Sequence, residues 1–320
     1  MKQSMLQLSK SQQNKDKFAR HVKYIDLNQH NSHDIVKGAS VLLGFCCDEG
    51  VRRNNGKVGA KKGPEHFRKE FFNLNFHHNR IDNKIIYDGG DIVCQGGLLE
   101  DAQKKLGVLV KKILDAGGSP IVIGGGHEMA YGHYMGIREA GYSPAILNFD
   151  AHFDLRKTLE GNQGSSGTPF RQIKELLDND RQPFKYYCCG IQRFANSEEL
   201  FDYAKKEGVQ YQMASDINLN PRDMSFIEKI IKEHKEIYLT VCLDVFSSEI
   251  APGVSAPQAL GINSLYVLEA IKMLKASGNV VSLDIAELNP SRDLQERTAK
   301  LSAHIAAEYL YQPKIINRNE

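Results

Sequence analysis

Short apolar runs alternate with amphipathic, helix-like segments along most of this sequence, and this alternation constrains the fold more than any other feature. A continuous apolar run is typical of a strand buried on both faces, and helices usually connect parallel strands. The pattern therefore predicts an α/β fold in which helices cover both faces of a mostly parallel sheet. The predicted strands span residues 39–46, 84–88, 119–123, 143–150, 184–189, 209–213, 236–243 and 280–285. The predicted helices begin near Pro64 or span residues 100–116, 128–139, 168–177, 197–207, 221–234, 263–276 and 293–311.

The chain has 320 residues, which is enough for one large α/β domain or two of ordinary size. No linker rich in Pro, Ser or Gly divides it, and no internal repeat is found, so we expect one domain. We place this domain at residues 36–320. It follows a polar segment, residues 1–35, that we expect to lie loosely on the surface.

Charge and composition exclude several classes of function. The net charge is +2, with cationic residues spread along the chain, which gives no electrostatic basis for binding nucleic acid or a membrane surface. No apolar run is long enough to span a bilayer, and residues 1–20 lack an apolar signal core. Six cysteines without metal-site spacing indicate reduced thiols and not a disulfide scaffold. We therefore expect a cytoplasmic protein.

Residues 148–154 place three metal-ligating side chains at every second position: Asp150, His152 and Asp154. They follow the apolar residues 145–147, which are predicted to be a buried strand. Alternate side chains of a strand point to the same face, so the three converge if the chain stays extended. Two carboxylates and an imidazole suit Mn²⁺, Zn²⁺ or Fe²⁺ better than Ca²⁺. Taken alone, the motif is more typical of a polar strand end at the surface.

Three other predicted strands also end in chemically active residues. His127 follows three glycines, Cys242 and Asp244 follow an apolar run, and Glu287 follows the last strand. In a parallel α/β sheet the site forms at the carboxyl ends of the strands. Core packing gives no reason to gather acids and imidazoles there, because unpaired buried charge is costly. The coincidence predicts one functional site.

With these motifs the sequence resembles the arginase/agmatinase/formimidoylglutamase (ureohydrolase) family over roughly residues 38–311. The resemblance implies a three-layer α/β/α sandwich and up to two Mn²⁺ ions. One ion would be held by His127, Asp150 and Asp154, and the other by Asp150, His152 and Asp244, with Asp150 bridging both.

Within this family the chain is most similar to the formimidoylglutamases. The similarity lies in the loop at residues 48–64, in residues 165–171 and in residues 251–257. Ser166 stands where arginases and agmatinases place an active-site histidine, which argues against arginine or agmatine as substrate. The resemblance thus implies hydrolysis of N-formimidoyl-L-glutamate to L-glutamate and formamide, a step of histidine breakdown.

The same resemblance suggests roles for further residues. Glu287 would hold the formamidinium group of the substrate, and Asp154 would carry a proton to the leaving amine. Arg156, Arg171 and Arg193 are candidates for binding the substrate carboxylates, although composition does not separate them from ordinary surface arginines. Thr168, in the segment that distinguishes this branch, is a further candidate for substrate binding.

Cys242 departs from the family pattern, which usually has a bridging aspartate there. A thiolate is softer than a carboxylate and favours Zn²⁺ or Fe²⁺ over Mn²⁺. We hypothesise one firm metal site and a weaker second site. The alternatives are a hydrolase of another guanidino or amidino acid, such as agmatine or guanidinobutyrate, and a weakly active or inactive homologue. The resemblance also allows a homo-oligomer.

Overall fold

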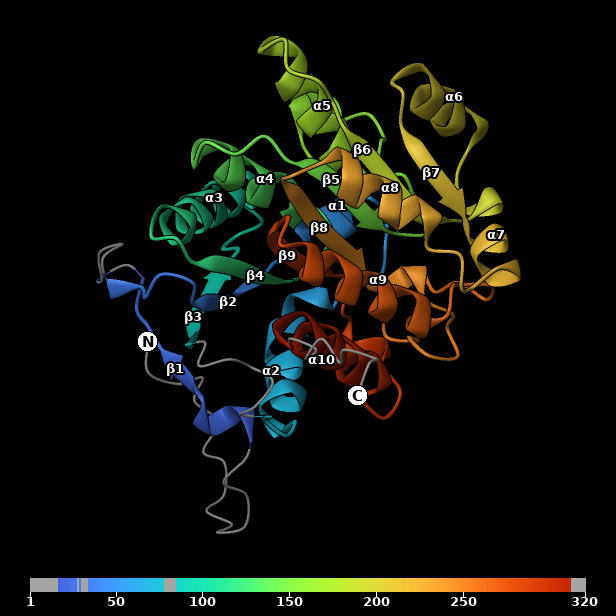
Figure 1. The fold of residues 1–320 in the computed structure, drawn as a ribbon. Coiled ribbons are helices and arrows are strands. Elements are labelled where there is room, and N and C mark those ends of the chain that lie inside the picture. The colour runs from blue at the N-terminus through green and yellow to red at the C-terminus, as the bar shows by residue number, and fades with distance from the viewer. Residues whose placement is uncertain (1–16, 28, 30–33, 78–84, 312–320) are drawn as a thin grey trace.

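A computed structural model describes residues 17–27, 29, 34–77 and 85–311. These residues form a nine-stranded, entirely parallel sheet with helices on both faces, which confirms the expected three-layer α/β/α sandwich (Figure 1). The strand order is β1-β3-β2-β4-β9-β8-β5-β6-β7. The strands are β1 (Val22–Tyr24), β2 (Ser40–Cys46), β3 (Ile86–Val93), β4 (Ser119–Gly124), β5 (Ala145–Phe149), β6 (Tyr186–Ile191), β7 (Gln210–Met213), β8 (Ile237–Cys242) and β9 (Val280–Ala286).

The two faces of the sheet carry separate hydrophobic cores. Successive strand residues point to opposite faces, so Leu239 and Val241 of β8 lie in one core and Tyr238 lies in the other. One core is covered by α3 (Leu99–Asp115), α4 (Met129–Glu139), α5 (Pro169–Asn179) and α6 (Glu198–Lys206). The other is covered by α2 (Gly63–Asn73), α7 (Ala214–Leu219), α8 (Ser225–Glu233), α9 (Ser264–Ser277) and α10 (Arg297–Leu310).

Four elements differ from the sequence-based expectation. The region expected as a long loop at residues 48–63 contains the short helix α1 (Glu49–Arg53) and a 3-10 turn at Ala60–Lys62. Helix α7 and strand β1 were also not expected, because each is too short to show a clear periodicity. Strand β1 pairs with β3, and Phe18 nearby is buried, so residues 18–27 pack against the sheet instead of lying loosely on it.

Most of the predicted polar N-terminal segment lies outside the described residues, and its boundary at residue 36 stays a prediction. No helix in the described ranges combines the length and the apolarity that crossing a membrane requires.

The strand order places the expected binding crevice at the centre of the sheet. Strands β4 and β5 follow each other in the sequence, yet β9 and β8 lie between them. The chain leaves β8 through α9 toward β9 and leaves β5 through α5 toward β6, over opposite faces of the sheet, so the connections of these two adjacent strands diverge at their carboxyl ends. Such a point is where α/β sheets form their binding sites. Four strand ends with functional residues meet at this point: those of β4, β9, β8 and β5.

Candidate metal centre

The segment after β5 supplies three converging side chains, as its spacing predicted. Asp150 is fully buried, its backbone N–H donates to Cys189 O (2.9 Å), and its Oδ1 accepts the backbone N–H of His152 (2.8 Å). Oxygens of Asp150 and Asp154 each lie 3.0 Å from Nδ1 of His127. Asp154 has a positive φ of 48°, a conformation that costs a non-glycine residue on the order of 1–3 kcal/mol. This backbone turns its carboxylate toward His127.

Glycines bring the segment after β4 close to its neighbours. A Cβ on Gly125 would lie 1.8 Å from Cys47 O, so no larger residue fits at this position. The chain then delivers His127, which is 1% exposed. Its backbone N–H donates to Glu287 Oε1 (2.9 Å), and its Nε2 lies 2.9 Å from Thr240 Oγ1. The backbone of His127 and one nitrogen of its ring are thereby both held in place.

The ends of β8 and β9 complete the site with Cys242, Asp244 and Glu287. Asp244 Oδ2 lies 3.2 Å from Nδ1 of His152. Two sets of ligand atoms result among the described residues, and in each set the atoms lie within 4.8 Å of one another. The sets are His127, Asp150 and Cys242, and Asp150, His152 and Asp244. The second is the expected one, whereas the first contains Cys242 where Asp154 was expected. Both share Asp150, so its carboxylate lies where a bridging ligand would be needed. We call His127, Asp150, His152, Asp154, Cys242 and Asp244 the ligand cluster.

Burial and the repulsion between carboxylates determine the direction in which the pKa of most acids at the site is shifted. Burial, reinforced by Asp150, raises the pKa of Asp154 to about 6 and also raises the pKa of Asp244. Burial together with Glu128 and Asp244 raises the pKa of Glu287 well above its usual value. For Asp150, burial opposes ionisation, but the imidazoles of His127 and His152 outweigh it and lower the pKa. The site thus concentrates more negative charge than its own histidines balance.

The side chains fit a divalent cation. Nδ1 of His127 has no hydrogen-bond partner, because the carboxylate oxygens at 3.0 Å do not lie in hydrogen-bonding geometry. Asp244 Oδ1 and Glu287 Oε2 are likewise buried without a partner. Unpaired buried donors and acceptors are costly, and a cation removes that cost by binding them. Imidazole, carboxylate and thiol ligands suit Mn²⁺, Zn²⁺ and Fe²⁺.

Cys242 is 2% exposed and belongs to the first ligand set alone, so Asp150 is the only residue that the two sets share, whereas the family pattern implies a bridging aspartate at position 242. Burial raises the pKa of its thiol well above the usual value, and the carboxylates of Asp150 and Asp244 raise it further. The thiol is therefore protonated in the metal-free protein.

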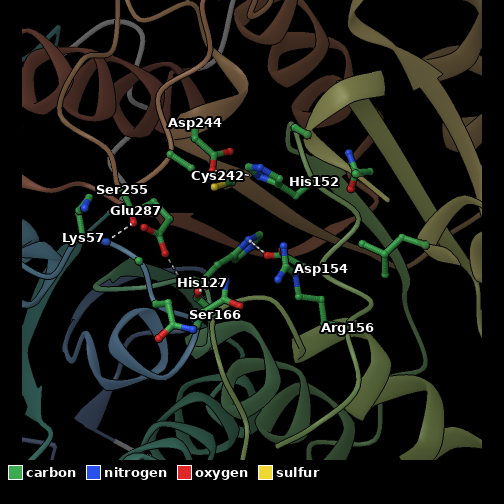
Figure 2. A pocket seen from close by; sticks show the side chains of 17 residues that line it. Lys57, His127, His152, Asp154, Arg156, Ser166, Cys242, Asp244, Ser255 and Glu287 are labelled. Atoms are coloured by element: carbon green, nitrogen blue, oxygen red, sulfur yellow. Dashed lines mark hydrogen bonds and ion pairs between the residues drawn. The ribbon is translucent and has the colours of Figure 1, made fainter. Parts of the chain in front are cut away.

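A cavity of about 280 Å³ opens onto the ligand cluster, and Glu287 lies on its wall (Figure 2). Arg156 lines this cavity, as predicted for a carboxylate-binding residue. Lys57 lines it too, although the sequence singled out only its glycine-rich loop. Neither side chain has an ion-pair partner among the described residues. Figure 2 shows Lys57 and Arg156 on opposite sides of the cluster.

The structure does not bring three of the sequence-predicted residues into this cavity. Thr168 is buried at the start of α5, where its hydroxyl accepts the backbone N–H of Ser165 (2.8 Å). Arg171 donates to Glu175 (3.1 Å) and stacks over the ring of Tyr203. Arg193 lines a separate hollow. Their assignment to substrate binding stays a prediction.

Ser166 lines the cavity, and its hydroxyl accepts a hydrogen bond from Asn54 Nδ2 (3.2 Å). A polar, uncharged pair thus stands at the position where the resemblance places a histidine in arginases and agmatinases.

Known proteins are similar to this chain in both fold and sequence. Residues 39–311 match the model of the Arginase family. The chain is 40% identical over 299 residues to formimidoylglutamase of Legionella pneumophila (strain Lens), covering 93% of this chain and 92% of that protein. Formimidoylglutamase of Bacillus subtilis has a similar structure, with a TM-score of 0.82, 23% identity and coverage of 96% of this chain and 95% of that one. Trypanosoma cruzi formiminoglutamase with Mn²⁺₂ matches with a TM-score of 0.81 and 25% identity, covering 93% of this chain and 100% of that one.

Proposed function

The chain belongs to the arginase family, and on this premise we propose that it hydrolyses N-formimidoyl-L-glutamate to L-glutamate and formamide. The observation that carries this proposal is the cavity itself, which has an acidic cluster at one end and unpaired cations at its sides. The substrate has the complementary charges: a formamidinium group at one end and two carboxylates at the other.

We propose that the ligand cluster holds a manganese-type ion, and up to two of them, with Zn²⁺ or Fe²⁺ as alternatives. The Mn²⁺₂ of the Trypanosoma cruzi structure and the two ligand sets that share Asp150 support this proposal. When bound, such an ion supplies a water molecule that is deprotonated near neutral pH. Because Cys242 stands in place of a carboxylate, the second ion is expected to bind more weakly than the first.

Glu287 and Asp154 are the residues of this chain that act on the substrate. The Glu287 carboxylate, with Oε1 fixed by the His127 N–H and Oε2 unpaired, is placed to accept hydrogen bonds from the formamidinium N–H groups. Water adds to the formimidoyl carbon, and the bond from that carbon to the glutamate nitrogen breaks. Asp154 delivers a proton to the departing nitrogen.

Lys57 and Arg156 fit the glutamate end of the substrate. Each is a cation that lines the cavity and lacks an ion-pair partner among the described residues. Agmatine has an ammonium and no carboxylate, and arginine has one carboxylate beside an ammonium, so two cations in the cavity favour the two carboxylates of formimidoylglutamate over both. The other substrates and the inactive homologue are not favoured, because the chain is 40% identical to a formimidoylglutamase over 299 residues.

The decisive test is a side-by-side measurement of turnover on formimidoylglutamate, agmatine, guanidinobutyrate and arginine. It is made after chelation and again after Mn²⁺ is restored. We expect formimidoylglutamate to have the highest kcat/KM and to require the metal. A higher kcat/KM for agmatine or guanidinobutyrate, or no turnover of formimidoylglutamate with Mn²⁺ present, would overturn the proposal.

Three broader expectations accompany this function. We propose that the reaction is a step of histidine breakdown, that the protein is cytoplasmic and that it can form a homo-oligomer. Cell fractionation and the mass of the purified protein in solution test the last two directly.

A further inference from the structure

A buried polar cluster lies directly behind His127, on the side away from the cavity. Thr240 and Tyr238 are on β8, Ser282 and Asp284 are on β9, and His133 is on α4. All five are fully buried. In the β8–β9 ladder Thr240 pairs with Asp284 and Tyr238 pairs with Ser282, so the four strand residues share one face of the sheet.

Hydrogen bonds link these side chains to the metal-ligating histidine. Nε2 of His127 lies 2.9 Å from the Thr240 hydroxyl, and the Thr240 and Tyr238 hydroxyls are hydrogen-bonded to each other. The Tyr238 hydroxyl donates to Asp284 Oδ2. Nδ1 of His133 donates to the same oxygen at 2.7 Å.

The second ring nitrogen of His133 also has a hydrogen-bond partner. Its Nε2 lies 2.6 Å from the Ser282 hydroxyl, which donates to Pro120 O at 3.0 Å. The cluster is therefore continuous from the backbone of β4 to His127.

The chemistry of the carboxylate sets the direction of every bond. A carboxylate only accepts, so the single hydroxyl hydrogen of Tyr238 points to Asp284. The Tyr238 oxygen then accepts from Thr240, which uses the single hydrogen of that hydroxyl. The Thr240 oxygen must in turn accept from Nε2 of His127. A hydrogen on Nε2 leaves the lone pair of the neutral imidazole on Nδ1, the atom that faces Asp150 and Asp154.

We infer that Thr240, Tyr238 and Asp284 are positioning residues that fix the tautomer and the orientation of His127 for metal binding. The inference rests on the proposed metal site, since it assigns a task to residues that touch no ligand. Stability alone does not explain this cluster. Asp284 Oδ1 is buried without a hydrogen-bond partner, and an unpaired buried polar atom destabilises the fold.

Mn²⁺ itself is the probe for the test, and its dissociation constant is measured on the full-length protein from the paramagnetic resonance signal of free Mn²⁺. Thr240→Val keeps the shape of the side chain and removes the hydroxyl. Thr240→Ser keeps the hydroxyl, and Tyr238→Phe removes the next link. Partners of metal ligands typically contribute about 10- to 100-fold in affinity, so Thr240→Val should weaken binding by that factor and Thr240→Ser should restore it.

Tyr266→Phe is the matched control. Tyr266 is as buried as Tyr238 in the other core, and its hydroxyl donates to Gln212 (2.9 Å), away from His127. It should lower the melting temperature without changing Mn²⁺ affinity. In the double variant of Thr240→Val with Tyr238→Phe, the affinity should equal that of Thr240→Val alone, because Tyr238 acts through Thr240.

Unchanged affinity in Thr240→Val, additive losses in the double variant, or an equal loss in Tyr266→Phe would overturn this inference while the proposed function stands. A wild-type protein that binds no Mn²⁺ would overturn both. If Thr240→Val does not fold, the comparison of Tyr238→Phe with Tyr266→Phe still decides the outcome.

Discussion

Cys242 is the residue whose chemistry differs most from its surroundings. Its thiol is held protonated by burial among carboxylates, whereas Mn²⁺ prefers carboxylate oxygens. We expect Cys242→Asp to bind Mn²⁺ about tenfold more tightly, which corresponds to ~1.4 kcal/mol. The same change should destabilise the metal-free protein by about 3 kcal/mol, because it adds an unpaired acid to a buried acidic cluster. Mn²⁺ titration and thermal unfolding with and without the metal measure the two effects.

Cys242→Ser serves as the control for this prediction, since it is similar in size and adds no charge. It should leave the stability of the metal-free protein close to that of the wild type and should not tighten Mn²⁺ binding. Equal Mn²⁺ affinity in Cys242→Asp and the wild type would show that the thiol does not limit the site.

Lys57 and Arg156 are expected to bind the substrate without taking part in the chemical step. A hydrogen bond to a charged group contributes on the order of 1.5–3 kcal/mol, so Lys57→Met and Arg156→Met should each raise KM about 10- to 100-fold. Such binding acts equally on ground state and transition state, and kcat should therefore change little. Steady-state kinetics on formimidoylglutamate measure both constants.

Lys157→Met is the matched control, because Lys157 pairs with Glu199 (3.2 Å) and does not line the cavity. It should leave KM unchanged. A fall in kcat with constant KM in Lys57→Met or Arg156→Met would contradict the assignment.

Three side chains hold the segment from α1 to the turn at Ala60–Lys62 in place. One of them lies just before α1, and the other two come from distant parts of the chain. Asp48 accepts the N–H of Gly59 (2.7 Å), and Glu128 accepts the N–H of Gly50 (2.9 Å). Asn289 donates to the carbonyls of Lys57 (2.8 Å) and Val58 (3.2 Å). The position of Lys57 at the cavity thus depends on the chain that follows β9.

Asn289→Ala should release this segment. Asn289 donates two hydrogen bonds to this segment, and its Oδ1 accepts two from Ser291, so at about 1 kcal/mol each their loss predicts a destabilisation of about 4 kcal/mol and a raised KM. Denaturant unfolding and steady-state kinetics on the same preparation provide the two measurements.

Asn279 offers a close comparison, because its side-chain amide also donates to two carbonyls, those of Ile231 (3.0 Å) and His234 (2.8 Å), but at the other end of β9. Asn279→Ala should lose stability while KM stays the same. If both variants raise KM equally, the anchoring of Lys57 by Asn289 has no bearing on the substrate.

The elements that the sequence predicted well are those with a strong period and a buried face. β5 and β8 were predictable as continuous apolar runs, and α5 was predictable from Pro169 at its start and its amphipathic pattern. β1 was not predictable, because its three residues include an exposed lysine and tyrosine at the edge of the sheet. Its position depends on pairing with β3, which no local pattern encodes.

The residues of the candidate site likewise divide into those that the sequence predicted and those that it did not. The ligand cluster was predictable because its residues follow strands whose carboxyl ends lie at one edge of the sheet. Strand alternation does not explain the convergence after β5, since β5 ends at Phe149 and the positive φ of Asp154 turns its carboxylate toward His127. Lys57 was not singled out, because its place at the cavity depends on Asn289, more than two hundred residues further along the chain. Thr240 and Tyr238 looked like ordinary strand residues, since their role depends on the neighbouring strand β9.

For the whole molecule, metal binding should be coupled to pH. Burial opposes protonation of His127 and His152, but the adjacent carboxylates outweigh it and raise the pKa of both imidazoles well above the usual value. In the metal-free protein their contribution to stability is therefore full below the unfolded pKa and is lost as pH rises through the folded pKa. Mn²⁺ requires the neutral imidazoles, so it competes with these protons.

We therefore expect the rise in melting temperature on adding Mn²⁺ to be larger at about pH 8 than at about pH 6. Thermal unfolding in Mn²⁺ and in chelator at each pH measures it. His127→Asn should flatten the dependence, because it removes one of the competing protons. A metal-induced rise that is constant or decreases with pH would contradict the coupling.

The strand order also determines at which point of synthesis the sheet can be completed. Strands β1 to β4 make one half of the sheet and β5 to β7 make the other, and only β8 and β9, translated last, join them. Until those two strands emerge from the ribosome, β4 and β5 each present an unpaired edge, which is prone to aggregation. His127 then belongs to one half and His152 to the other. The set of Asp150, His152 and Asp244 follows β5 and β8 alone, whereas the set that contains His127 needs β9 to join the halves, which requires roughly nine-tenths of the full length. A product truncated before β9 should therefore lack the ligand set that contains His127.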